Sequence, residues 1–212
     1  NRTEKYFNEP ASWEYCQNTI REILVEMGVK FTEVDDEATF YGPKIDVQFK
    51  SVIGREESMS TIQLDFIAKE RFGLTYTDSD GQENKEVFVI HRAPLSTHER
   101  FIAFLIEHYV GAFPVWLSPV QAKILPVSEK YLDYSQKVFV ELKERDIRVE
   151  LDESNETLGK KVRVAKQEKI PYLIIIGEKE VTEEKITVES RDSGNSQQLT
   201  TDDFIELIKK EI

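Results

Sequence analysis

Apolar residues recur along the first part of this 212-residue chain with a helical rhythm, followed by strand-like runs. From Trp13 to Met27 they return every three or four residues, which predicts a helix capped by Asn8 and ended by Gly28. Strand-like runs then follow at 31–34, 39–41, 45–52, 61–66 and 87–92. The polar stretch 77–85 predicts a hairpin turn. We therefore expect an antiparallel sheet with helices.

A second rhythm begins after a predicted helix over 96–109, with capping-box spacing between Ser96 and Glu99. Ala112-Phe113-Pro114 breaks that helix. Beyond it, apolar runs at 120–125, 147–151, 172–176 and 186–190 alternate with helical patterns, and a last helix follows Thr200 or Thr201. Such alternation is typical of an α/β sandwich with a largely parallel sheet. The pattern predicts two domains, 1–113 and 114–212.

Polar residues interrupt three of the strand-like runs in the first domain. Lys44, Gln63 and Arg92 each lie in an otherwise apolar segment. Burying such groups costs free energy unless partners satisfy them. The three runs are therefore expected to line one polar pocket.

Composition narrows the classes of protein only slightly. The net charge is -12, which argues mildly against a nucleic-acid partner, because phosphate binding needs local Lys and Arg. The most basic segment is 160–169, and a solvated helix face is its simplest interpretation. The only cysteine, Cys16, lies on an apolar stripe and fits a reducing cytoplasm. No apolar run approaches the ~20 residues of a membrane span, and no signal peptide is evident.

Individual residues leave alternatives open. Arg100 falls in the first turn of its helix, where free N–H groups favour an anion, but it could also pair with Glu99 or Glu107. Tyr41 and Lys44 flank a Gly-Pro turn, which turn chemistry alone could explain. His91 ends a strand, and zinc needs three or four ligands that spacing alone does not supply.

Three motifs, taken in order, carry a resemblance to a known family. They are Phe40-Tyr41-Gly42-Pro43-Lys44-Ile45-Asp46, Thr61-Ile62-Gln63-Leu64-Asp65-Phe66, and Ile90-His91-Arg92-Ala93 running on to His98-Glu99-Arg100-Phe101. They resemble the back half of the class II threonyl-tRNA synthetase catalytic domain. The later motifs Gly159-Lys160-Lys161-Val162-Arg163 and Gly177-Glu178-Lys179-Glu180-Val181 look like the anticodon-binding domain shared by related synthetases.

The resemblance implies a fold and a set of roles. The fold would be a partial α+β antiparallel-sheet synthetase core followed by a three-layer α/β anticodon-binding domain. Lys44 and Arg100 would be catalytic cations, and His91 the third ligand of a zinc ion whose other ligands are not in this chain. Residues binding substrate or ATP would be Tyr41, Lys44, Thr61, Gln63, Thr97 and Arg100. Those binding the anticodon would be Asn155, Arg163, Lys169, Lys179, Glu180 and Arg191.

The family also implies partners and an activity. The activity would be activation of threonine with ATP and its transfer to threonine tRNA, with the C-terminal domain binding the anticodon. The partners would be ATP with Mg²⁺, threonine, threonine tRNA and a second subunit, in the cytoplasm and without a membrane. We expect the chain by itself to bind no metal and to be inactive, because the upstream catalytic motifs are missing. The alternative is a non-catalytic synthetase-like paralogue or an RNA-binding regulator. Two departures stand out: Glu57-Ser58 replaces the usual Trp-Gln, and Glu189 stands where relatives carry an arginine.

Overall fold

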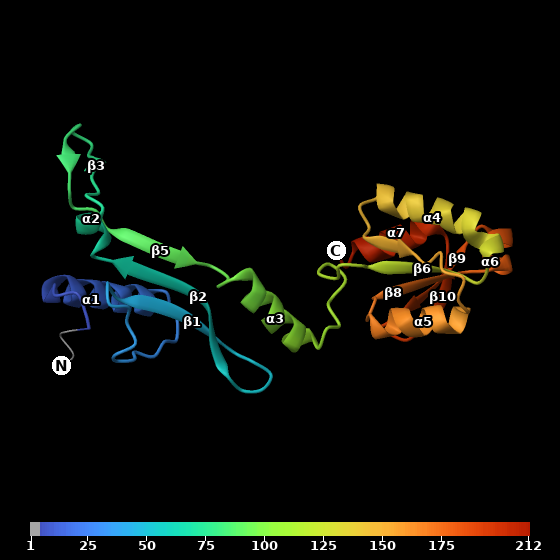
Figure 1. Ribbon diagram of the computed structural model, residues 1–212, viewed down its shortest axis with the longest axis horizontal. Coiled ribbons are helices and arrows are strands. Elements are labelled where there is room, and N and C mark those ends of the chain that lie inside the picture. Colours follow the sequence, from blue (N-terminus) through green and yellow to red (C-terminus); the bar gives the residue numbers. More distant parts are fainter. Residues whose placement is uncertain (1–4) are drawn as a thin grey trace. The chain divides into compact units, whose positions relative to one another are not determined.

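The computed structural model describes residues 5–212, which form two compact units divided between Phe104 and Leu105 (Figure 1). We refer to them as the first and second units. The division falls inside helix α3 (His98–Tyr109), ahead of the boundary expected at 113/114. That boundary stays a prediction. No helix in the described part is long and apolar enough to cross a membrane.

Helix α1 (Pro10–Glu26) opens the first unit, and its cap differs from the prediction. The N-cap is Glu9, not Asn8, because Pro10 occupies the first helical position and keeps the residue before it out of the helical conformation. Cys16 is buried, as its place on the apolar stripe predicted. Met27, at the end of the same stripe, is exposed.

The sheet of the first unit has three antiparallel strands in the order β1-β2-β5 (Figure 1). They are β1 (Lys44–Lys50), β2 (Glu56–Asp65) and β5 (Val89–Ala93), and β2 is followed by the short helix α2 (Ala68–Arg71). The predicted hairpin is present as β3 (Tyr76–Thr77) and β4 (Glu83–Asn84). The run 31–34 is not a strand, and 39–42 contributes only an isolated bridge.

The second unit is built on a five-stranded sheet in the order β10-β9-β8-β6-β7. Its strands are β6 (Ala122–Pro126), β7 (Val149–Leu151), β8 (Tyr172–Ile176), β9 (Ile186–Ser190) and β10 (Ser196–Leu199). The prediction of a largely parallel sheet is wrong, because β9 pairs antiparallel with both β8 and β10. Only β6 pairs in parallel, with β7 and with β8.

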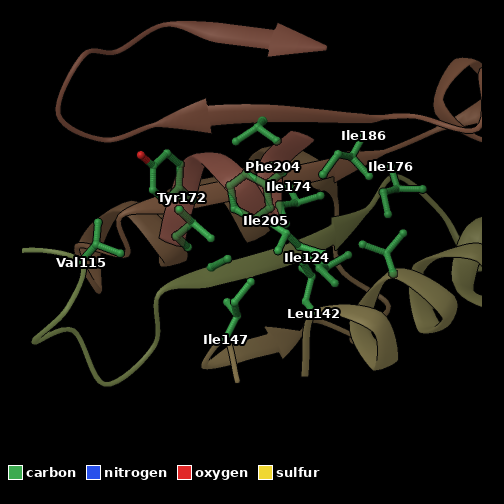
Figure 2. Packing of buried hydrophobic residues seen from close by; sticks show 14 residues of the cluster. Val115, Ile124, Leu142, Ile147, Tyr172, Ile174, Ile176, Ile186, Phe204 and Ile205 are labelled. Atoms are coloured by element: carbon green, nitrogen blue, oxygen red, sulfur yellow. The ribbon is translucent and has the colours of Figure 1, made fainter. Parts of the chain in front are cut away.

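Helices cover both faces of this sheet, which gives the expected three layers. They are the 3-10 turn η1 (Glu129–Tyr131), α4 (Leu132–Glu144), α5 (Leu158–Gln167), α6 (Glu178–Glu183) and α7 (Thr201–Lys209). Residues of α4 and α7 share one buried cluster with β6, β8 and β9, whereas Ala165 of α5 belongs to a separate cluster. In Figure 2 the ring of Phe204 lies within the larger cluster, near Ile174 and Ile205.

Candidate functional site

One face of the β1-β2-β5 sheet gathers most of the polar residues singled out in the first unit. The strand register places Lys44 opposite Gln63 and Gln63 opposite His91. The neighbouring row consists of Asp46, Thr61 and Ala93. Since alternate residues of a strand share a face, these rows form one polar surface.

Arg92 does not belong to this surface, which corrects the expectation of a single pocket lined by all three polar interruptions. It lies opposite Ile62, on the other face of the sheet, and is exposed. Because Arg92 is exposed, its charge does not need a buried partner. The residue that β5 contributes to the polar surface is His91, which lies opposite Gln63.

Tyr41 joins the polar surface because the backbone before β1 lies against the end of β2. Leu64 N–H donates to Pro43 O at 3.0 Å, and Phe66 N–H donates to Tyr41 O at 2.9 Å. A Cβ on Gly42 would lie 2.1 Å from the Leu64 carbonyl oxygen, so only glycine permits this approach. The Gly-Pro turn thus serves a close packing that positions Tyr41.

The side chains of this surface are linked by hydrogen bonds. The Tyr41 hydroxyl donates to Gln63 Oε1, and Gln63 Nε2 donates to Thr61 Oγ1 at 3.2 Å. Lys44 forms an ion pair with Asp46, and both side chains are largely buried. A strand face that holds a cation, an amide and two hydroxyls can bind a small polar ligand through several directed contacts.

His91 contacts Asp65, a residue that the sequence analysis did not single out. His91 Nε2 lies 2.9 Å from Asp65 Oδ2, while Asp65 Oδ1 accepts hydrogen bonds from the N–H groups of Ile67 and Ala68, each at 2.9 Å. Burial opposes ionisation of Asp65, but these hydrogen bonds outweigh it, so its pKa lies below the ordinary value. Its place two residues after Gln63, on the same strand face, was the available signal.

A zinc site would need several ligating side chains close together. Within residues 5–212, no three His, Cys, Asp or Glu side chains gather in a way that could hold a metal ion. His91 and Asp65 alone do not make a ligand set, since zinc sites use three or four protein ligands.

Thr97 and Arg100 lie at the start of α3, beyond the end of β5. Thr97 Oγ1 accepts a hydrogen bond from Arg100 N–H at 3.4 Å, so the cap falls at Thr97 and not at the expected Ser96. Ser96 instead has a left-handed backbone, with φ 56°. Arg100 is exposed, and within residues 5–212 it forms neither of the ion pairs considered for it, with Glu99 or Glu107.

In the second unit, the predicted anticodon residues divide into exposed and internally bonded groups. Asn155, Arg163 and Lys179 are exposed on the loop after β7, on α5 and on α6. Glu180 is buried, and accepts hydrogen bonds from Gly177 N–H at 2.9 Å and from the Thr187 hydroxyl at 2.7 Å. Burial disfavours its charge, but these bonds prevail and its pKa lies below the ordinary value.

Lys169 and Arg191 are committed to backbone carbonyls within the second unit. The Lys169 ammonium donates to Val110 O, and its backbone is left-handed, with φ 58°. The Arg191 guanidinium donates to Lys169 O at 2.8 Å and to Phe113 O at 3.0 Å, and it also pairs with Asp192. These contacts favour a structural role for both cations.

The basic segment 160–169 is not a uniform solvated face. Lys166 pairs with Glu189 at 2.6 Å, and Lys160 pairs with Glu156 at 2.6 Å. Lys161, in contrast, is buried, with 5% of its surface exposed. Glu189 therefore has a cationic partner on α5, which the sequence position alone did not reveal.

Comparison with known proteins places both units. Residues 7–109 match the family described as the tRNA synthetase class II core domain (G, H, P, S and T). Residues 121–211 match the family described as the anticodon binding domain. The chain therefore belongs to the class II aminoacyl-tRNA synthetases, as a core-domain segment followed by an anticodon-binding domain.

Within that class, the whole chain is similar to the C-terminal part of threonine–tRNA ligases. It is 49% identical over 212 residues to the ligase of Clostridium perfringens, covering 100% of this chain and 33% of the relative. It is 47% identical over 210 residues to that of a Geobacillus species, covering 99% and 32%. The chain thus spans about a third of the length of these curated relatives.

A solved structure agrees with this assignment. It is the RNA binding domain of threonyl-tRNA synthetase from Cryptosporidium parvum, with a TM-score of 0.85 and 33% identity. The similarity covers 98% of this chain and 52% of that one. The expected fold, a partial synthetase core followed by an anticodon-binding domain, is confirmed.

Proposed function

We propose that the protein containing this chain activates threonine with ATP and transfers it to threonine tRNA, and that the second unit binds the anticodon. The observation that carries this proposal is the similarity to threonine–tRNA ligases along the whole chain, through both units. We place the activity in the cytoplasm, in an enzyme that is a homodimer.

The polar surface of the first unit would bind the substrates of the activation step. Hydrogen bonds between the side chains of Tyr41, Gln63 and Thr61 fix their positions. Held in this way, the three side chains orient the aminoacyl-adenylate. Lys44 and Arg100 stabilise negative charge on the carboxylate and phosphates during in-line displacement. Thr97 holds the first turn of α3, which carries Arg100. Mg²⁺ accompanies ATP, and His91 would be the third ligand of a zinc ion whose other two ligands are not among the residues of this chain.

On the RNA side, the exposed residues Asn155, Arg163 and Lys179 contact the anticodon arm. Unpaired bases are read by hydrogen bonds to their edges, and cations hold the backbone. Three further residues support this surface without contacting the RNA, because hydrogen bonds within the second unit occupy their side chains. They are Glu180, Lys169 and Arg191.

The RNA half of the proposal is tested by titrating a labelled anticodon stem-loop of threonine tRNA with the chain at fixed salt, against a stem-loop with a mismatched anticodon. We expect tighter binding of the threonine stem-loop, and weaker binding by Arg163→Ala. Equal affinity for the two RNAs would overturn anticodon recognition. Salt must be held constant, because phosphate contacts dominate the affinity.

The catalytic half is tested by threonine-dependent ATP–pyrophosphate exchange in the full-length protein. Lys44→Ala and Arg100→Ala should each lower the exchange rate by about 10²–10³, the usual effect of removing one electrostatic stabiliser. Arg71→Ala, on the surface at the end of α2, is the matched control. Exchange unaffected by both variants would exclude these cations from catalysis. Stem-loop binding without any exchange would favour the non-catalytic paralogue.

A further inference from the structure

A crevice of about 320 Å³ lies in the second unit, at the carboxyl ends of β6 and β7. Its walls are the segment Val127–Lys130 after β6 and the segment Ser154–Glu156 after β7, and Lys161 also lines it. The chain leaves β6 toward α4 on one face of the sheet and leaves β7 toward α5 on the other. Ligands of α/β proteins bind at such points of divergence.

Lys161 is the buried cation of this crevice. Its ammonium donates to Asp152 O at 3.1 Å and to Pro126 O at 3.4 Å, and lies 3.8 Å from Asp152 Oδ1. Burying an ammonium is costly unless it is paired and hydrogen-bonded. Pro126 ends β6 and Asp152 follows β7. The Lys161 ammonium is therefore hydrogen-bonded to both walls of the crevice, at the point where each segment leaves the sheet.

Asp152 also fixes the conformation of the loop that follows β7. Its Oδ1 accepts hydrogen bonds from Ser154 N–H at 3.0 Å and from the Ser154 hydroxyl. Burial disfavours the charge on Asp152, but the bonds from Ser154 and the nearby Lys161 outweigh it, so its pKa lies below the ordinary value. The turn is thus fixed immediately before Asn155, which lines the crevice.

We propose that Lys161 is a positioning residue for RNA recognition, which clamps the two walls of the crevice and so presents Asn155 to an unpaired anticodon base. This inference rests on the proposed anticodon binding and adds a residue that acts from the interior. Lys161 itself does not contact RNA, because Asp152 and Pro126 occupy its ammonium. Preorganisation of this kind improves affinity by reducing the ordering that binding would otherwise require.

The test compares Lys161→Met with Lys160→Met in the full chain. Both remove one positive charge, from adjacent positions of α5, but Lys160 is exposed and pairs with the exposed Glu156. Hydrogen exchange at Ser154 N–H and the affinity for threonine and mismatched anticodon stem-loops are measured for both. We expect about tenfold faster exchange and about tenfold weaker threonine stem-loop binding in Lys161→Met, the scale of one lost charge-assisted hydrogen bond.

The ratio of the two RNA affinities separates positioning from general damage. A merely structural role would weaken both stem-loops alike, whereas loss of a presented Asn155 lowers the preference for the threonine stem-loop. If Lys161→Met keeps the parent's exchange rate and preference, the proposal is overturned. If the parent itself shows no preference, anticodon recognition fails, and the exchange rate at Ser154 still decides whether the clamp exists.

A second variant covers the case in which Lys161→Met does not fold, as judged by circular dichroism. Asp152→Asn keeps the shape of the side chain and the carbonyl acceptor but removes the charge beside Lys161. We expect faster exchange at Ser154 and a lower RNA preference, in the same direction as Lys161→Met. Parent-like behaviour of Asp152→Asn in both measurements would overturn the proposal.

Discussion

The two units differ in where they place their apolar residues. Among residues 5–212, eighteen of the buried apolar side chains lie in the second unit and four in the first. In the first unit Ile90 is 61% exposed, while the polar residues Lys44, Gln63 and Asp65 are partly buried. The second unit therefore has a large buried apolar core. In the first unit, polar residues of the candidate site are less exposed than the apolar residue Ile90.

This difference predicts unequal stability. Burial of apolar surface is the main favourable contribution to folding, and regions with few buried apolar side chains open at lower free energy. We expect the first unit to open before the second under denaturant. Matched pairs of substitutions, one in each unit, can test this.

The largest effect is expected from Phe204→Ala in the second unit. Phe204 is fully buried and packs edge-on against Tyr172, with ring centroids 5.4 Å apart (Figure 2). Its loss should cost about 3–5 kcal/mol of unfolding free energy. The control is Phe88→Ala in the first unit, where Phe88 is 53% exposed and should cost about 1 kcal/mol or less. Similar losses in urea unfolding would contradict the difference between the units.

A glycine pair should give effects of opposite sign. In Gly42→Ala the new Cβ meets the Leu64 carbonyl, so the first unit should lose about 1–3 kcal/mol. In Gly159→Ala the new Cβ meets nothing within 4 Å and lies in α5, so the second unit should gain about 0.5–1 kcal/mol. The measurement is the urea midpoint of each unit's own transition. A parent-like Gly42→Ala would mean that Tyr41 is not held by the close approach.

Acid should weaken the second unit through Glu180. Its folded pKa is lowered, so the unfolded chain binds more protons near pH 4. Its contribution is present above the unfolded pKa of about 4.3 and is lost as pH falls through the folded value. Glu180→Gln should cost about 1–2 kcal/mol at pH 7, and the gap from the parent should close in acid. The exposed Glu178→Gln is the control, and an equal pH profile for both variants would refute the assignment.

The smallest difference is expected at two helix caps. Thr200 Oγ1 accepts from Asp203 N–H at 3.1 Å at the start of α7, and Thr97 Oγ1 accepts from Arg100 N–H at 3.4 Å. Thr200→Ala should cost about 1 kcal/mol and Thr97→Ala about 0.5 kcal/mol, because the second bond is longer. Thermal unfolding monitored by helix signal resolves the two. A larger loss of stability in Thr97→Ala than in Thr200→Ala would contradict this prediction.

Strong local patterns were predictable from the sequence. The continuous apolar run at 172–176 predicted β8 at its true bounds, and the alternation at 186–190 did the same for β9. The direction of β9 was not predictable, because hydrophobic periodicity does not encode strand direction. The segment 31–34 failed as a strand because pairing partners, and not propensity, decide such short runs.

Site residues were predictable as residue types but not as contacts. The row Lys44–Gln63–His91 follows from register, which no single strand reveals. Lys161 and Arg191 looked like surface cations, yet one is buried and the other is bonded to carbonyls distant in sequence. Only tertiary structure distinguishes a cation that binds a ligand from one that holds the fold.

The bonds made by Lys169 and Arg191 have a practical consequence for dissecting the protein. A fragment cut at the expected boundary, beginning with residue 114, would remove Val110 O and Phe113 O and leave both cations without those acceptors. A fragment that begins at Leu105 keeps both. Anyone who excises the second unit should place the cut ahead of Val110, and should expect the shorter piece to be less soluble and more readily degraded.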